Sequence, residues 1–130
     1  SPTIQPDYRE IGRRLGEQLK TKKQKIGIIA DWKMSEAVQA EISGLTEALE
    51  GSGSEISWCI YRRKEQNITE RMKEETKADA LVILDPGVLE EFGEQAEHGK
   101  YKGAELYGVG YSLKIVPTRS WKNFDRKIPV

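Results

Sequence analysis

Apolar residues near the start of the chain recur every three to four positions, which is the spacing of one face of a helix. Tyr8, Ile11, Leu15 and Leu19 carry this pattern, and Asp7 stands where an N-cap is expected. The pattern predicts a first helix that ends near the basic run 20–25, because positive charges suit a helix C-terminus.

The pattern then changes to short runs of consecutive apolar residues. Such runs predict strands at 26–30, 56–61, 80–84 and about 104–109. Unbroken apolar strands are typical of a parallel sheet, because helices cover both of its faces. Helical spacing returns between the strands, at 34–49, about 67–77 and 88–96. The Gly/Ser-rich run 51–54 ends the second of the helices.

This alternation predicts an α/β fold: a three-layer, doubly wound parallel sheet of about four strands, of the Rossmann-like or flavodoxin-like type. Right-handed crossovers leave 2-1-3-4 as the simplest strand order. We expect residues 1–116 to form this single lobe. Residues 117–130 are expected to be a C-terminal tail, or a truncated connection that continues in a longer protein.

Composition limits the partners. The 130 residues fit one domain, and 21 basic residues balance 21 acidic ones. A net charge of zero creates no global field that would attract nucleic acid or an anionic membrane, so no direct nucleic-acid contact is expected. The single Cys59 has no partner for an internal disulfide and is expected to be buried and inert. No apolar run reaches the length of a membrane span, and no signal-peptide pattern opens the sequence.

A ligand site is predicted where the crossovers from the first strand diverge. In the order 2-1-3-4 this is the crevice between strands one and three, at their carboxyl ends. The side chains expected around it are Asp31, Trp32, Ser35, Tyr61, Asp85, Tyr111 and Ser112. Carboxylates accept hydrogen bonds from sugar hydroxyls, and aromatic rings cover the apolar faces of a pyranose. Plainer interpretations stay open, since Asp31 and Asp85 also suit helix caps and Trp32 a core edge or an interface.

Several catalytic motifs are missing from the sequence. The turn at 30–33 has no glycine, so it does not resemble a phosphate-binding loop. His98 is the one histidine, and neither a second histidine nor a cysteine is near it, so no metal site is expected. It is also far from any nucleophile in the expected fold. We therefore expect no enzyme activity and no cofactor.

The order of these segments resembles the periplasmic-binding-protein type 1 and LacI-type sugar-binding family. The resemblance spans about residues 5–115 and rests on segments 7–16, 25–30, 35–44, 78–85 and 106–112. The first has a Gly-x-x-x-Gly-like spacing, the fourth looks like the family strand "DALVVxD", and the last like "xxGxGxS". The chain looks most like one lobe of a sugar ABC transporter solute-binding protein.

The resemblance implies a function and its partners. It implies a small polar solute, a sugar or polyol, enclosed between this lobe and a second lobe of the parent protein. As part of a transport receptor the chain would be extracytoplasmic or at the cell surface, and otherwise cytoplasmic. Asp85 matches a polar ligand contact of the family. Glu41 stands where the family often has an arginine, and Ser112 where it often has an aspartate. From the residues alone, Glu41 is expected on the solvated side of the second helix.

Three other functions stay open. One is the effector-binding lobe of a LacI-type transcription regulator. Another is a receiver-like phosphoswitch with Asp85 as the phosphate acceptor, for which Ser112 fits and Asp31 stands alone after the first strand. The last is a structural or dimerising domain, because an open sheet edge and the aromatic residues Trp121 and Phe124 favour a homodimer.

Overall fold

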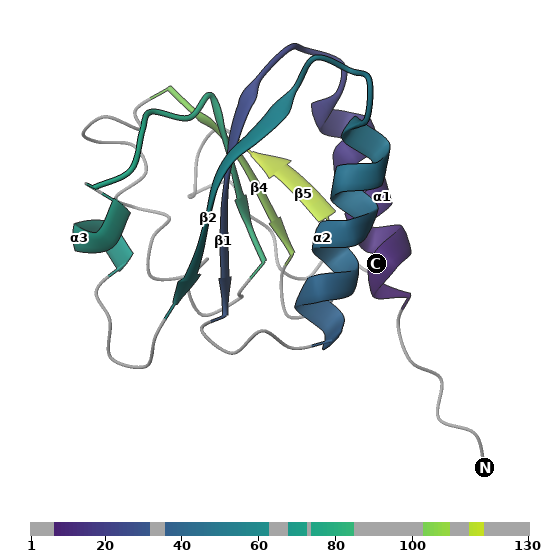
Figure 1. Cartoon of the computed structure of the whole chain (residues 1–130), viewed down its shortest axis with the longest axis horizontal. Helices are drawn as coiled ribbons and strands as arrows, with labels where there is room; N and C mark the ends of the chain where they lie inside the picture. The colour runs from purple at the N-terminus through teal and green to yellow at the C-terminus, as the bar shows by residue number, and fades with distance from the viewer. Residues whose placement is uncertain are drawn as a thin grey trace.

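One sheet with helices on both faces forms the centre of the molecule (Figure 1). The structure is a computed structural model that describes residues 7–31, 36–62, 68–72, 74–84, 103–109 and 115–118. The elements, in chain order, are α1 (Tyr8–Leu19), β1 (Lys25–Asp31), α2 (Glu36–Leu49), β2 (Glu55–Arg62), α3 (Ile68–Met72), β3 (Ala80–Ile83), β4 (Glu105–Val109) and β5 (Ile115–Thr118).

The sheet confirms the predicted α/β class and strand order. Its order is β2-β1-β3-β4-β5, and the first four strands are parallel to one another. The fifth strand was not predicted. It pairs antiparallel with β4, places Pro117 beside Tyr107, and spans the predicted boundary at residue 116. Pro117 lacks a backbone N–H, and an edge strand is where a sheet tolerates that loss.

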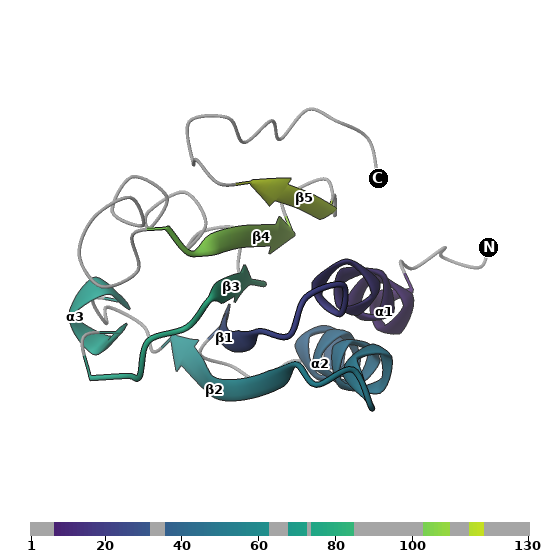
Figure 2. The ribbon, with the colours of Figure 1, turned by 90° about the horizontal axis from the view of Figure 1, so that it is seen from above.

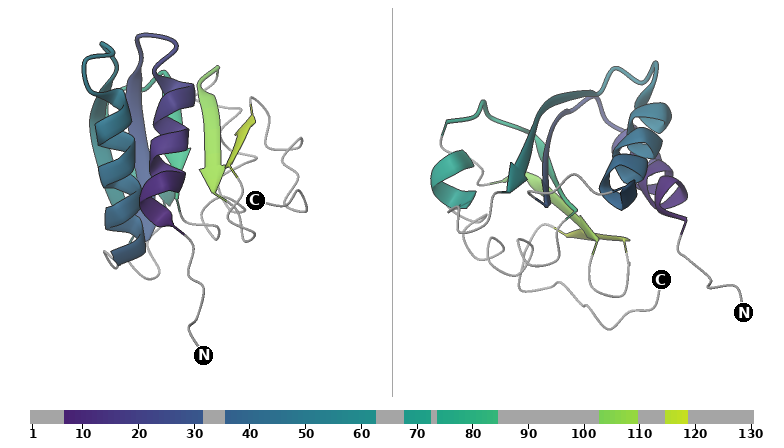
Figure 3. Two further views of the ribbon diagram at one scale, coloured as in Figure 1. Left: turned by 90° about the vertical axis from the view of Figure 1, so that its right-hand side faces the viewer. Right: turned by 60° about the horizontal axis from the view of Figure 1, so that its bottom comes forward.

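The alternating side chains of β1 supply both halves of the core. Ile26 and Ile28 point to the face covered by α1 and α2, where they pack with Leu15 and Leu45. Ile29 points to the other face. Figures 2 and 3 show α1 and α2 side by side on one face of the sheet and α3 on the opposite side. A strand buried on both faces explains the unbroken apolar run that predicted it.

The first helix matches its prediction, whereas α3 is shorter than predicted. Asp7 caps α1, since its Oδ1 accepts a hydrogen bond from the Glu10 amide at 3.1 Å. The helix expected at about 67–77 is α3, which covers only Ile68–Met72. The amides of Glu74 and Glu75 reach back three residues, so tight turns follow the helix. The helix expected at 88–96 lies outside the described residues.

Glycines bring α1 and α2 into backbone contact. A Cβ added to Gly12 would lie 1.8 Å from the carbonyl oxygen of Glu41, and one added to Gly44 would lie 1.9 Å from that of Arg9. Gly16 faces Ala48 one turn further along each helix, so the two helices run parallel. The Gly-x-x-x-Gly spacing of the sequence is therefore a helix-packing surface.

Replacing Gly44 with alanine should separate the two helices. The added methyl group has no space beside the Arg9 carbonyl, so α1 and α2 must move apart over the sheet. Overpacking of this kind typically costs about 1–3 kcal/mol, and we expect the upper part of that range because the clash is with backbone. Chemical denaturation of Gly44→Ala measures the loss.

The neighbouring substitution Ser43→Ala is the matched control. Ser43 is exposed on the same turn of α2, so alanine there should leave the free energy of unfolding within about 0.5 kcal/mol of the wild-type value. Equal stability of the two variants would contradict the close helix contact.

Candidate functional site

The carboxyl ends of the parallel strands form one edge of the sheet, and this edge is the candidate site. Asp31 at the end of β1 is the register partner of Arg62 at the end of β2, and Ile29 is that of Ile83 in β3. The connection from β1 to β2 includes α2, and that from β2 to β3 includes α3 on the opposite face (Figure 2). The crossovers thus diverge between β1 and β3, where open α/β sheets favour ligands.

Only part of the predicted site can be followed in the structure. Trp32, Ser35, Asp85, Tyr111 and Ser112 lie outside the described residues. Asp31, which was expected in the loop after the first strand, is the last residue of β1 and lies beside β2, and its side chain is outside the described part of the chain. The two predicted site residues with described side chains are Glu41 and Tyr61.

Tyr61 lies one residue before the end of β2 and beside Ala30 of β1. Its ring is half-buried and packs against the core on the face that α1 and α2 cover. Burial, with a smaller contribution from the Cys59 thiol, raises the pKa of Tyr61 to about 12. The hydroxyl is therefore neutral at physiological pH and can serve as a hydrogen-bond donor. Cys59 itself is half-buried, and burial raises the pKa of its thiol.

Glu41 is buried, and its expected place on the solvated side of α2 was wrong. Only 4% of its surface is exposed, and its Oε2 has no hydrogen-bond partner. The sequence pattern assigned one apolar face to α2, the face that packs on the sheet. The glycine contact with α1 covers a second face, and the backbone of Glu41 lies on it against Gly12.

Loss of hydration changes the chemistry of this carboxyl group. Burial raises the pKa of Glu41 from 4.5 to about 7, so the neutral and charged forms both occur near physiological pH. Helical side chains lean toward the N-terminus of their helix, and in α2 that end follows the carboxyl end of β1.

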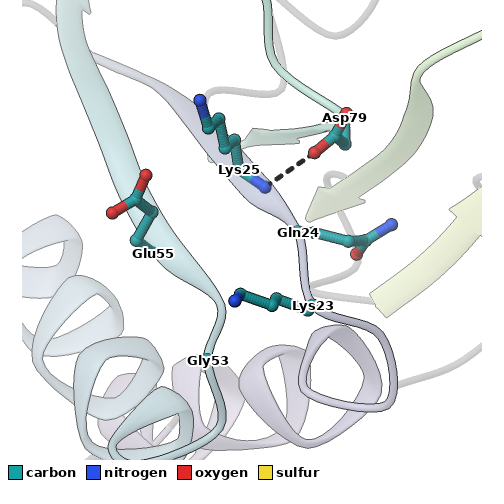
Figure 4. Close-up of a pocket in the computed structure, with 6 residues that line it drawn as sticks. All are labelled: Lys23, Gln24, Lys25, Gly53, Glu55 and Asp79. Atoms are coloured by element: carbon teal, nitrogen blue, oxygen red, sulfur yellow. Dashed lines mark hydrogen bonds between the residues drawn. The ribbon is translucent and has the colours of Figure 1, made fainter.

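The opposite edge of the sheet carries a hollow that the sequence did not predict (Figure 4). Its volume is about 420 Å³, and its lining residues are Lys23, Gln24, Lys25, Gly53, Glu55 and Asp79. Asp79 accepts a hydrogen bond from the Lys25 amide at 2.9 Å, and Ser54 accepts one from the Gln24 amide at 3.1 Å. These bonds join the starts of neighbouring strands. The two lysines and two acids of the lining balance in formal charge.

A second polar cluster at the same edge is also structural. Glu105 at the start of β4 accepts hydrogen bonds from Lys22 and from the Tyr107 hydroxyl, the latter at 2.8 Å. Lys22 is the main cause that lowers the pKa of this carboxyl group. The described residues therefore satisfy the polar groups of this edge internally, in contrast to the unpartnered oxygen of Glu41.

Two further searches covered the part of the chain that the structure describes. No group of three or more His, Cys, Asp or Glu side chains there is arranged to hold a metal ion. No helix there has the length and apolar character needed to span a bilayer.

Comparison with known proteins adds no relative. No family model, no curated protein and no solved structure matches this chain.

Protonation of Glu41 should make stability depend on pH. Its pKa is higher in the folded state, so the folded protein holds the proton more tightly than the unfolded chain. The free energy of unfolding is therefore highest below pH 4.5, the pKa of the unfolded chain. It falls as the pH rises to about 7, the pKa of the folded protein. At about 1.4 kcal/mol per pH unit, this interval corresponds to about 3 kcal/mol. Urea unfolding between pH 4 and 8 measures it.

Glu41→Gln removes the ionisation and keeps the shape. We expect the wild-type protein to lose about 3 kcal/mol relative to Glu41→Gln between pH 4.5 and 8, with the two curves parallel above pH 8. Glu50→Gln, an exposed acid just after the same helix, should follow the wild-type curve. Parallel curves for wild type and Glu41→Gln over the whole range would mean that Glu41 has an ordinary pKa.

Proposed function

We propose that this domain is one lobe of a transport receptor and binds a small polar solute, a sugar or polyol, at the carboxyl edge of its sheet. The proposed activity is recognition without chemical conversion. The solute lies over the divergence of β1 and β3 and is enclosed from the other side by a second lobe.

The buried Oε2 of Glu41 is the observation that carries the proposal. A buried polar atom without a partner typically costs about 1–3 kcal/mol, and native structures contain few of them. A ligand hydroxyl that approaches from the edge would supply the missing hydrogen bond. The neutral form of Glu41 can also donate, so a hydroxyl, which both donates and accepts, suits this group better than a simple cation or anion.

The fold supports the same location. Open α/β sheets bind ligands at the carboxyl end of the strands where crossovers diverge, and β1 and β3 provide that position. The resemblance in the sequence implies the same edge for a sugar. A lone lobe supplies about half of such a site and leaves the ligand exposed to water, so we expect weak binding, with a Kd in the millimolar range.

Thermal unfolding with a panel of stereoisomeric sugars tests this function. At a concentration ten times the Kd, a ligand stabilises by about 1.4 kcal/mol, which should raise the Tm by about 3 °C or more. Aldoses and polyols at 50 mM are suitable probes. We expect at least one stereoisomer to raise the Tm by this amount above its isomers, since non-specific stabilisation by sugars does not distinguish them.

Variants connect the response to the edge. Glu41→Leu removes both carboxyl oxygens at a similar size, so it should lose at least half of the stereoisomer-specific shift at pH 7. Glu50→Leu lies just after α2 at its far end and should keep the whole shift. A panel with no difference between isomers, or a shift that Glu41→Leu leaves intact, would argue against this function.

A further inference from the structure

The two edges of the sheet differ in how well they are protected against pairing with another strand. An exposed edge strand offers unpaired N–H and C=O groups, and native proteins usually shield it. At one edge β5 is short and contains Pro117, which cannot donate to a further strand. At the other edge β2 is eight residues long and contains no proline. Among the described strands, β2 is therefore the edge strand better suited to pairing with a further strand.

The sequence of β2 suits a symmetric contact. The charged residues are Glu55 at its start and Arg62 at its end, with six uncharged residues between them. Figure 2 shows β2 at the margin of the sheet, with β1 as its neighbour on the inner side. A strand with opposite charges at its two ends is complementary to an antiparallel copy of itself.

The bulge in β2 determines which residues share a face. Ile56 pairs with Ile26 of β1 and Trp58 with Gly27, so Ser57 is an extra residue. Ile56, Cys59 and Tyr61 therefore lie on the face of α1 and α2. Trp58 and Ile60 lie on the opposite face. A two-fold axis perpendicular to the sheet keeps every residue on its own face, which limits the registers that two copies can adopt.

We propose that a second copy of this chain pairs antiparallel with β2 around a two-fold axis that passes between the two Cys59 residues. In this register Trp58 lies opposite Ile60 of the second copy. Allowing for the bulge, Ile56 lies opposite Tyr61 and Glu55 opposite Arg62. The pairs 58/60 and 56/61 each join residues of one face, and residues 55 and 62, which have opposite charge in the sequence, hold matching register positions at both ends. Cross-strand pairs of these kinds stabilise a sheet.

A groove beside β2 gives this contact a place for a side chain of the second copy. It has a volume of about 450 Å³ and lies between the end of α2 and the start of β2, with Leu49 and Ile56 in its lining. In the proposed register, Tyr61 of the second copy lies opposite Ile56 and on the same face. An aromatic ring there would cover the apolar floor of the groove. The dimer contact includes Tyr61, which the sequence also predicted for the solute site, so the two proposed surfaces adjoin at the carboxyl end of β2.

Sedimentation of the full chain from 5 to 500 µM tests the dimer, and charge substitutions test its register. Glu55→Arg and Arg62→Glu each replace two symmetry-related attractions with repulsions. We expect each to raise the dimer Kd about tenfold or more, as two pairs at about 0.5–1 kcal/mol each imply. The double variant Glu55→Arg/Arg62→Glu restores opposite charges and should return the Kd to within about threefold of the wild-type value.

Cys59 provides a second, independent measurement of the register. Residues opposite each other in antiparallel strands have Cα atoms about 4.5–5.5 Å apart, within the range that a disulfide spans. Diamide, which accepts two electrons and two protons as two thiols join, should therefore link the two copies through Cys59 at pH 8.5. In a Cys59→Ser background, Ser57→Cys should not link, because the two residues 57 lie several positions out of register.

Each outcome decides the proposal. A concentration-dependent dimer that follows the charge substitutions and links through Cys59 supports it. A chain that stays monomeric up to 500 µM overturns it and leaves β2 to a different occupant. A dimer whose Kd does not change with the charge substitutions overturns it as well. The same holds for a dimer that forms a disulfide through residue 57 and not through Cys59. Circular dichroism of each variant shows whether it is folded.

Discussion

The backbone contact between α1 and α2 is the constraint on which the rest of the described structure depends. Gly12 and Gly44 allow the two helices to approach until carbonyl oxygens of one helix lie where a Cβ of the other would be. Helices held this close present one surface to the sheet, to which α1 supplies Leu15 and α2 supplies Leu45. Larger side chains at the glycines would separate the helices and leave voids above β1, and packed interiors tolerate such voids poorly.

The same contact explains the most unusual side chain of the described residues. Glu41 lies beside Gly12, so the approach of α1 removes it from water without providing a partner for Oε2. Burial alone accounts for its raised pKa. A carboxyl group that is neutral about half of the time near pH 7 can exchange hydrogen bonds in both directions. Helix packing has thus produced a buried polar group with a raised pKa in the contact between α1 and α2.

The sheet separates two kinds of contact in space. The crossovers diverge at its carboxyl edge, whereas its amino edge carries hydrogen bonds such as that from the Lys25 amide to Asp79. The outer side of β2 is a third surface, which runs along the strand from the amino edge of the sheet to its carboxyl edge.

Local pattern in the sequence determined most of the fold. Regular spacing from Tyr8 to Leu19 and the apolar run in β1 predicted elements within a residue or two, because each pattern reflects how one element meets the core. The balanced charge argued against nucleic-acid binding, and the missing glycine-rich loop argued against phosphate binding. The strand β5 was missed because Pro117 is unfavourable inside a sheet and acceptable only at an edge, and an edge is a property of the whole sheet.

The state of Glu41 was decided by tertiary structure alone. The helical spacing of α2 identifies its apolar face, and it places Glu41 on the other side, where solvent is expected. Whether a second helix covers that side depends on residues about thirty positions earlier, since Gly12 and Gly16 allow α1 to approach. The pairing potential of β2 likewise required the strand order and the bulge at Ser57. The sequence by itself determined the first two helices, the four parallel strands and their order. The packing between the elements decided which polar group lost its water, because burial arises from contacts between distant segments.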